Sequence, residues 1–170
     1  SVDDVAVRLI GAVRIEVGGV EVACRGLRES ALLARLAIDV GTVVSRDRLL
    51  DDVWSDSGAG SRNALRVQMS RLRKLLDSAG APEVIETRGN GYVLRLGRDA
   101  IDLLEATDRI NASAMATNAD GSISHDAGAP IPSLDGVRPL EGLEDFDFVR
   151  SVVDRFGRLL VSAHQQMARG

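Results

Sequence analysis

A run of basic residues between positions 61 and 77 is the part of this chain best suited to binding chemistry. From Arg62 to Leu76 the sequence has five basic residues and no acidic residue. Leucine or methionine recurs at positions 65, 69, 72 and 76, which predicts an amphipathic helix over residues 61–77 with one apolar stripe. Like charges on such a helix repel one another unless an anion lies beside them, and double-stranded DNA is the commonest such anion. The pattern therefore favours a DNA-binding helix.

The side chains outside the apolar stripe are the candidates for DNA contact. Arg71 or Arg66 suits a bidentate pair of hydrogen bonds to guanine, and Asn63 or Gln68 suits adenine. Val67 is an apolar residue on the polar side of the helix, which fits contact with a thymine methyl group. The set also contains Ser70 and three cations expected to bind phosphate oxygens, which are Arg62, Arg73 and Lys74. A solvated basic face without any groove contact is the alternative.

A short hairpin is predicted directly after the helix. Two runs rich in β-branched and aromatic residues, 84–87 and 92–96, flank a Gly-Asn-Gly tip where positive φ is easily adopted. Arg88 and Asn90 are candidates for contact with the minor groove or the DNA backbone. Residues 88–92 would then form the wing of a winged helix, although a simple tight turn would satisfy the two glycines equally well.

These two segments resemble the winged helix of OmpR-type transcription regulators. The resemblance is carried by VQMSRLRKLL at 67–76 and IETRGNGYVL at 85–94, and VSRDRLLDDVW at 44–54 is similar to the version in the Streptomyces antibiotic regulatory protein (SARP) family of bacterial activators. It covers residues 7–96 and implies an α+β fold with an N-terminal antiparallel sheet, three helices and a C-terminal hairpin wing. It also implies that helix 61–77 inserts in the major groove with the wing alongside.

In the SARP family a helical bacterial transcriptional activation domain follows the winged helix, and residues 138–149 resemble a piece of it. The resemblance therefore predicts a winged-helix DNA-binding domain at 1–98 and a partial activation domain at 99–170, with a flexible loop near 117–136. It further implies a homodimer on direct repeats and recruitment of RNA polymerase. The loop at 55–60 is a candidate polymerase contact, although a plain connection fits it at least as well.

Charge is distributed unevenly along the chain. The formal net charge is −4, but residues 1–98 hold 15 Lys/Arg and 13 Asp/Glu, a net of +2, whereas residues 99–170 hold 6 and 12, a net of −6. Residues 62–98 hold 8 against 3, a net of +5, so the positive field is local, as a DNA-binding face requires. The alternative is a winged-helix protein-interaction module that has lost DNA binding, with acidic residues covering Arg66 and Arg71.

Catalytic, cofactor and metal sites are not predicted. His125 and His164 have no cysteine or third ligand at metal-binding spacing, and GAGSR at 58–62 lacks the lysine of a phosphate-binding loop. Cys24 is the only cysteine, and no apolar run approaches the roughly 20 residues that span a bilayer. We therefore expect a cytoplasmic protein that is not an enzyme, carries no cofactor and does not bind membranes.

Other elements are expected to hold the helix and wing in place. Residues 5–10, 12–17 and 20–23 are β-prone runs that fit the sheet implied by the resemblance, although a generic meander fits them equally well. Residues 27–40 predict a helix, and Ser45 is the predicted N-cap of a second helix.

The remaining expectations concern the core and the C-terminal part. Trp54 is expected in the core, and Ser61 is expected to cap the basic helix. Residues 102–115 and 145–167 predict two more helices. The last of these is expected to pack on the winged helix or on another subunit, because an isolated helix pair rarely buries enough surface alone.

Overall fold

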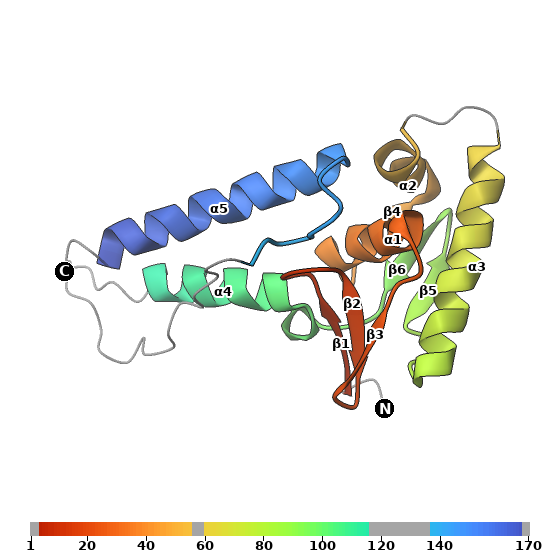
Figure 1. Cartoon of the computed structure of the whole chain (residues 1–170), viewed down its shortest axis with the longest axis horizontal. Helices are drawn as coiled ribbons and strands as arrows, with labels where there is room; N and C mark the ends of the chain where they lie inside the picture. Colours follow the sequence, from red (N-terminus) through yellow and green to blue (C-terminus); the bar gives the residue numbers. More distant parts are fainter. Residues whose placement is uncertain (1–3, 56–59, 116–136, 168–170) are drawn as a thin grey trace.

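The computed structural model describes residues 4–55, 60–115 and 137–167, and Figure 1 shows how its helices and strands are arranged. The N-terminal sheet has three antiparallel strands in the order β1-β2-β3. These strands are β1 (Val5–Arg8), β2 (Arg14–Val17) and β3 (Val20–Ala23). The predicted antiparallel sheet is confirmed.

Helix α1 (Leu27–Ile38) is the central element, and every residue from Ala31 to Ala37 is buried. It packs against two helices and one strand of the wing. These neighbours are α2 (Arg46–Val53), α3 (Ser61–Ala79) and β6 (Gly91–Leu94). A helix covered on several sides is apolar around most of its circumference, which explains the buried run. The helix predicted over residues 27–40 is confirmed.

The starts of α2 and α3 show one correct cap and one wrong cap. Ser45 caps α2 as predicted, because its Oγ accepts a hydrogen bond from the backbone N–H of Arg48 at 3.1 Å. The predicted cap at Ser61 is wrong: the N-cap of α3 is Gly60, with φ 103° and no side-chain cap. Glycine adopts such a positive φ without strain, so Ser61 is already helical. Trp54, which follows α2, is buried in the core as predicted.

The wing is a hairpin in a sheet of order β4-β6-β5. Its outer strands are β4 (Val44–Ser45) and β5 (Ile85–Arg88). A Cβ at Gly91 would lie 2.3 Å from the carbonyl oxygen of Val44, so glycine is needed for β4 to approach β6 this closely. The hairpin predicted from the Gly-Asn-Gly tip is confirmed.

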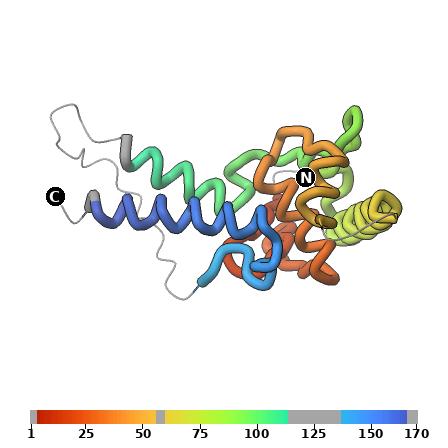
Figure 2. The backbone as a smooth tube through the Cα atoms, turned by 90° about the horizontal axis from the view of Figure 1, so that it is seen from above, coloured from red at the N-terminus to blue at the C-terminus, as the bar shows by residue number. Residues whose placement is uncertain are grey.

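Two C-terminal helices pack against each other and extend away from α3 (Figures 1 and 2). They are α4 (Asp102–Met115) and α5 (Asp147–Met167), and the short helix η2 (Arg98–Ala100) precedes them. Both helices were predicted. The predicted loop at 117–136, with His125, lies outside the described residues, as do residues 56–59 of the predicted polymerase-facing loop.

Hydrogen bonds tie the C-terminal part to the N-terminal sheet. The Asp102 carboxylate accepts from the backbone N–H of Leu9 at 2.6 Å. The backbone N–H of Leu140 donates to the carbonyl of Leu9 at 2.7 Å, and that of Gly11 donates to the carbonyl of Arg138 at 2.9 Å. The α4–α5 pair is therefore fixed on the side of the molecule away from α3, while the domain boundary at residue 98 stays a prediction.

Candidate nucleic-acid interface

Helix α3 has one buried face and one exposed basic face. Its buried residues are Leu65, Met69, Leu72, Leu75 and Leu76, which include the predicted apolar stripe. Most of the predicted DNA-contacting residues lie on the exposed face, which we call the outer ridge. The ridge consists of Arg62, Asn63, Arg66, Val67, Ser70, Arg71 and Lys74, all exposed. Val67 is 41% exposed, so its methyl groups are accessible on the ridge.

The cations of the outer ridge are weakly paired. Within the described ranges, no ion pair involves Arg66, Arg71 or Lys74. Arg62 lies 3.8 Å from Asp47, and both side chains are exposed. Such a surface pair contributes roughly 0–1 kcal/mol, so Arg62 can exchange Asp47 for another anion. The ridge therefore presents positive charge that the described protein groups do not neutralise.

The acidic C-terminal part does not cover this ridge. Helices α4 and α5 extend from the opposite side of the molecule, with α1 and the N-terminal sheet between them and α3 (Figures 1 and 2). Three of the Asp and Glu residues described in this part pair with nearby arginines: Asp108 with Arg98 at 2.7 Å, Glu105 with Arg109, and Asp147 with Arg150. The outer ridge is therefore accessible to a ligand along the length of α3.

The wing lies beside α3 and carries its own charges. Arg88 and Asn90 are exposed at its tip. Glu86 pairs with Arg88 at 3.1 Å and with Arg95 at 2.9 Å, and the hydrogen bond from Arg88 holds the pKa of Glu86 below its ordinary value. The carbonyl of Asn90 accepts from the backbone N–H of Arg46 at 3.0 Å, which fixes the tip against the start of α2.

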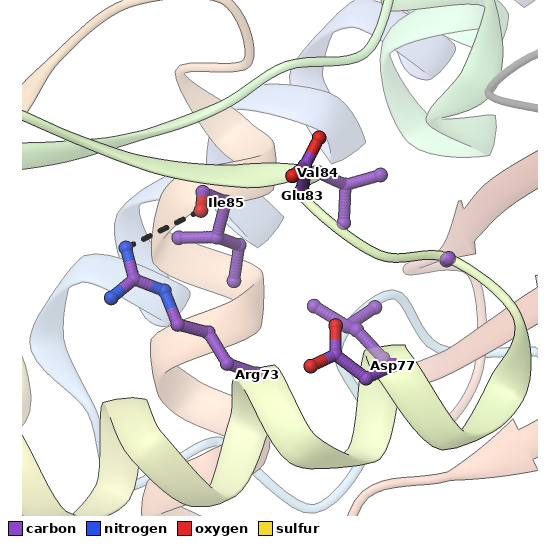
Figure 3. A pocket seen from close by; sticks show the side chains of 7 residues that line it. Arg73, Asp77, Glu83, Val84 and Ile85 are labelled. Atoms are coloured by element: carbon purple, nitrogen blue, oxygen red, sulfur yellow. Dashed lines mark hydrogen bonds between the residues drawn. The ribbon is translucent and has the colours of Figure 1, made fainter.

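Arg73 differs from the ridge cations because it joins α3 to the wing. Its guanidinium donates to Thr87 Oγ1 at 2.7 Å and to the carbonyl of Ile85 at 3.3 Å, the second of which Figure 3 shows. It also lies over the Tyr92 ring, 5.3 Å from the centroid. Arg73 therefore positions the wing, and its predicted phosphate contact stays a prediction. Gln68 is half-buried beside the ridge.

Arg46 is part of this arrangement although the sequence did not single it out. Its guanidinium lies 5.2 Å from the centroid of the Tyr92 ring, so two arginines contact the same buried aromatic ring. Position 46 gave no signal on its own, because the contact depends on the pairing of β4 with β6. The cation-π contacts fix α2, α3 and the wing relative to one another.

Three hollows line the sides of α3. One, of about 280 Å³, lies toward the wing and is lined by Arg66, Ser70, Arg73 and Tyr92 among others. A second, of about 330 Å³, lies on the other side and is lined by Arg25, Arg71 and Lys74 among others. The third, of about 290 Å³, lies between the end of α3 and β5, and Figure 3 shows Asp77 and Glu83 at its rim. The first two hollows adjoin the outer ridge.

Other kinds of site find no support in the described residues. Among them, no group of three or more His, Cys, Asp or Glu side chains is placed to hold a metal ion. None of the helices in the described ranges has the length and apolar character that crossing a membrane requires.

Comparison with known proteins shows what the central part of the chain is similar to. The profile of the family described as "transcriptional regulatory protein, C terminal" matches residues 25–94. The response regulator MprA of Mycobacterium sp. (strain KMS) is 43% identical over 68 residues, which cover 39% of this chain and 30% of that protein. MprA of Mycobacterium tuberculosis (strain ATCC 25177 / H37Ra) gives the same identity and coverage. The chain thus spans under a third of the length of these curated relatives.

A solved structure of similar fold covers almost the whole chain. Mycobacterium tuberculosis EmbR, solved in complex with a low affinity phosphopeptide, has a TM-score of 0.77 and 24% sequence identity. The likeness covers 95% of this chain and 44% of EmbR. At that identity the likeness shows the fold alone.

Proposed function

We propose that this chain is a sequence-specific regulator of transcription that binds double-stranded DNA, because residues 25–94 match the profile of the transcriptional regulatory protein C-terminal family. Helix α3 enters the major groove, and the wing at residues 88–92 lies alongside. The observation that carries the proposal is the outer ridge. Its cations are exposed, three of them (Arg66, Arg71 and Lys74) have no ion pair among the described residues, and the ridge faces away from helices α4 and α5.

The ridge has the dimensions and chemistry of a groove-reading helix. The major groove of B-DNA, about 12 Å wide, admits one α-helix. Arg66 and Arg71 lie on opposite flanks of the ridge and suit guanine, while Val67 between them suits a thymine methyl group. Lys74 and Arg62 suit phosphates at the two ends of the contact. Specificity therefore resides in the middle of α3, and affinity in its ends and in the wing.

The wider role follows from the family resemblance. We propose an activator that binds direct repeats as a homodimer and contacts RNA polymerase, with residues 1–98 as the DNA-binding domain and 99–170 as a partial activation domain. The rival function, a protein-interaction module without DNA binding, requires acidic residues over Arg66 and Arg71. The described acidic residues of the C-terminal part lie elsewhere, which favours DNA.

Selection of bound sequences from random double-stranded DNA tests this function. The enriched site is then labelled, and its affinity for the full chain is measured by fluorescence anisotropy over a salt series. If about six phosphates are engaged, the logarithm of the association constant falls against the logarithm of salt concentration with a slope of about −5. A flat salt dependence together with no enriched sequence refutes the proposal.

A further inference from the structure

Arg25 brings a cation from outside the helix-turn-helix to the side of α3 that faces away from the wing. It lies in the short link between β3 and α1, and it is exposed. Its side chain lines the 330 Å³ hollow together with Arg71, Lys74 and Ser78 of α3. Residues 71, 74 and 78 are three and four positions apart, so they share one flank of the helix. Two segments far apart in sequence thus place three cations around one hollow.

The backbone around Arg25 is fixed, which makes its position reproducible. The N–H of Arg25 donates to the carboxylate of Glu29, a side chain that is only 3% exposed. The next residue, Gly26, has φ 126° and is the N-cap of α1. Glu29 is the one carboxylate among the described residues that line this hollow, and it already accepts the hydrogen bond from the backbone of Arg25. The three cations Arg25, Arg71 and Lys74 therefore share one nearby anion.

A helix in the major groove meets phosphates on both of its flanks, because each wall of the groove is one DNA strand. On the flank of α3 toward the wing, Arg66 and Arg88 can meet one strand. On the other flank lies Arg71, and Arg25 extends that flank outward from the helix. Lys74 lies between the two flanks and lines the hollow on each side. The cations on the two flanks of α3 are therefore placed to contact the phosphates of both DNA strands.

We propose that Arg25 and Lys74 form a phosphate clamp beside the base-reading Arg71, and that this clamp binds the DNA strand on the side of α3 opposite the wing. The clamp rests on the proposed function, because it requires α3 in the groove. Arg25 supplies affinity without sequence preference, since it lies outside the base-reading part of the ridge.

Replacement of Arg25 tests the clamp on the full chain with the selected DNA site. Each phosphate contact multiplies the association constant by the salt concentration raised to the power of about −0.9. Loss of one contact in Arg25→Ala therefore lowers the association constant about fivefold at 0.15 M salt. It also makes the slope of log association constant against log salt concentration less negative by about 0.9. Arg25→Lys keeps the charge and keeps the slope. Arg158→Ala removes a charge from the exposed side of α5, far from α3, and serves as the matched control without effect.

The position of the contact is tested with DNA that carries one neutral methylphosphonate at a time. Wild-type protein loses affinity at phosphates on both walls. Arg25→Ala no longer responds to substitution of the phosphate that Arg25 contacts, on the wall away from the wing, and keeps its response at the other phosphates. Arg88→Ala gives the complementary pattern. If wild type binds and Arg25→Ala matches it in affinity and slope, or if both variants lose the same phosphates, the clamp is refuted while the proposed function stands. If wild type binds no DNA, both proposals fail.

Discussion

Arg35 and Arg71 lie on neighbouring packed helices, yet their surroundings are opposite. The Arg35 side chain is 7% exposed, and its guanidinium donates to Asp39 and Asp52, each at 2.7 Å. Arg71 is exposed on the outer ridge and has no ion pair among the described residues. Burial alone lowers the pKa of Arg35, but the hydrogen bonds to Asp39 and Asp52 hold that pKa above its ordinary value.

The contrast separates charge that maintains the fold from charge that is available to a partner. A buried cation must have its anions inside the protein, because burial of an unpaired charge is costly. An exposed cation retains water, so it can exchange that water for a phosphate at little cost. The interior between α1 and α2 is therefore fully paired, while the ridge of α3 is not. Variants at the two arginines should affect different measurements.

The largest effect is expected from Arg35→Ala. Removal of the guanidinium takes two hydrogen bonds from the carboxylates of Asp39 and Asp52, although Asp52 keeps its pair with Arg48 at 3.0 Å. We therefore expect a loss of about 2–3 kcal/mol of unfolding free energy. Urea unfolding followed by circular dichroism measures this change. Arg62→Ala, which removes only the exposed 3.8 Å pair with Asp47, is the control and should change stability by less than about 0.5 kcal/mol. If Arg35→Ala and Arg62→Ala lowered the unfolding free energy equally, the distinction between buried paired arginines and exposed arginines would be wrong.

Arg71→Ala should give the inverse result. We expect a loss of about 1–3 kcal/mol of binding free energy on the selected DNA site if Arg71 contacts a base, with a smaller loss on unrelated DNA. Stability should stay within about 0.5 kcal/mol of wild type, because Arg71 is exposed. Anisotropy titrations on both DNA sequences and a urea series provide the comparison. A variant that loses equal affinity on both sequences would show Arg71 to be a phosphate contact instead.

The sequence predicted the parts of this arrangement that depend on local periodicity. The apolar stripe of α3, the cap at Ser45 and the Gly-Asn-Gly hairpin each involve residues within a few positions of one another. The exposed ridge follows directly from the stripe, because the two faces of one helix are fixed together. The wrong cap at Ser61 has a local cause as well: sequence preference favours serine, and a positive φ at Gly60 shifted the helix start by one residue.

Contacts between distant segments could not be predicted in the same way. Asp102 accepts a hydrogen bond from Leu9, 93 positions earlier, and no periodicity relates the two. The stack of Arg46 and Arg73 over Tyr92 depends on the β4–β6 pairing, and the approach of Arg25 to α3 depends on the start of α1. Long-range packing therefore determines which arginines make contacts that hold the fold together and which stay exposed.

Arg73→Ala tests the intermediate case, a ridge neighbour that is used structurally. Loss of its hydrogen bonds to Thr87 and Ile85 and of its contact with Tyr92 should cost about 1 kcal/mol of unfolding free energy. Amide hydrogen exchange should accelerate in β5 and β6 more than in α1. Arg73→Lys keeps a cation near the ring but lacks the planar fork, so it should recover part of the stability. Unchanged exchange in the wing would show that Arg73 does not hold it.

The smallest effect concerns the exposed ion pairs of the wing, where pH is the probe. The pKa of Glu86 lies below its ordinary value of 4.5, chiefly because Arg88 donates a hydrogen bond to its carboxylate. A lowered pKa in the folded state means that the pair contributes above pH 4.5 and is lost as the pH falls through the folded-state pKa. An NMR titration of the Glu86 carboxyl carbon should therefore have its midpoint below 4.5 in wild type and closer to 4.5 in Arg88→Ala. Arg62→Ala should leave the Glu86 midpoint unchanged. If the midpoint does not rise in Arg88→Ala, Arg88 does not pair with Glu86 and resembles Arg66 and Arg71, which have no ion pair within the described residues.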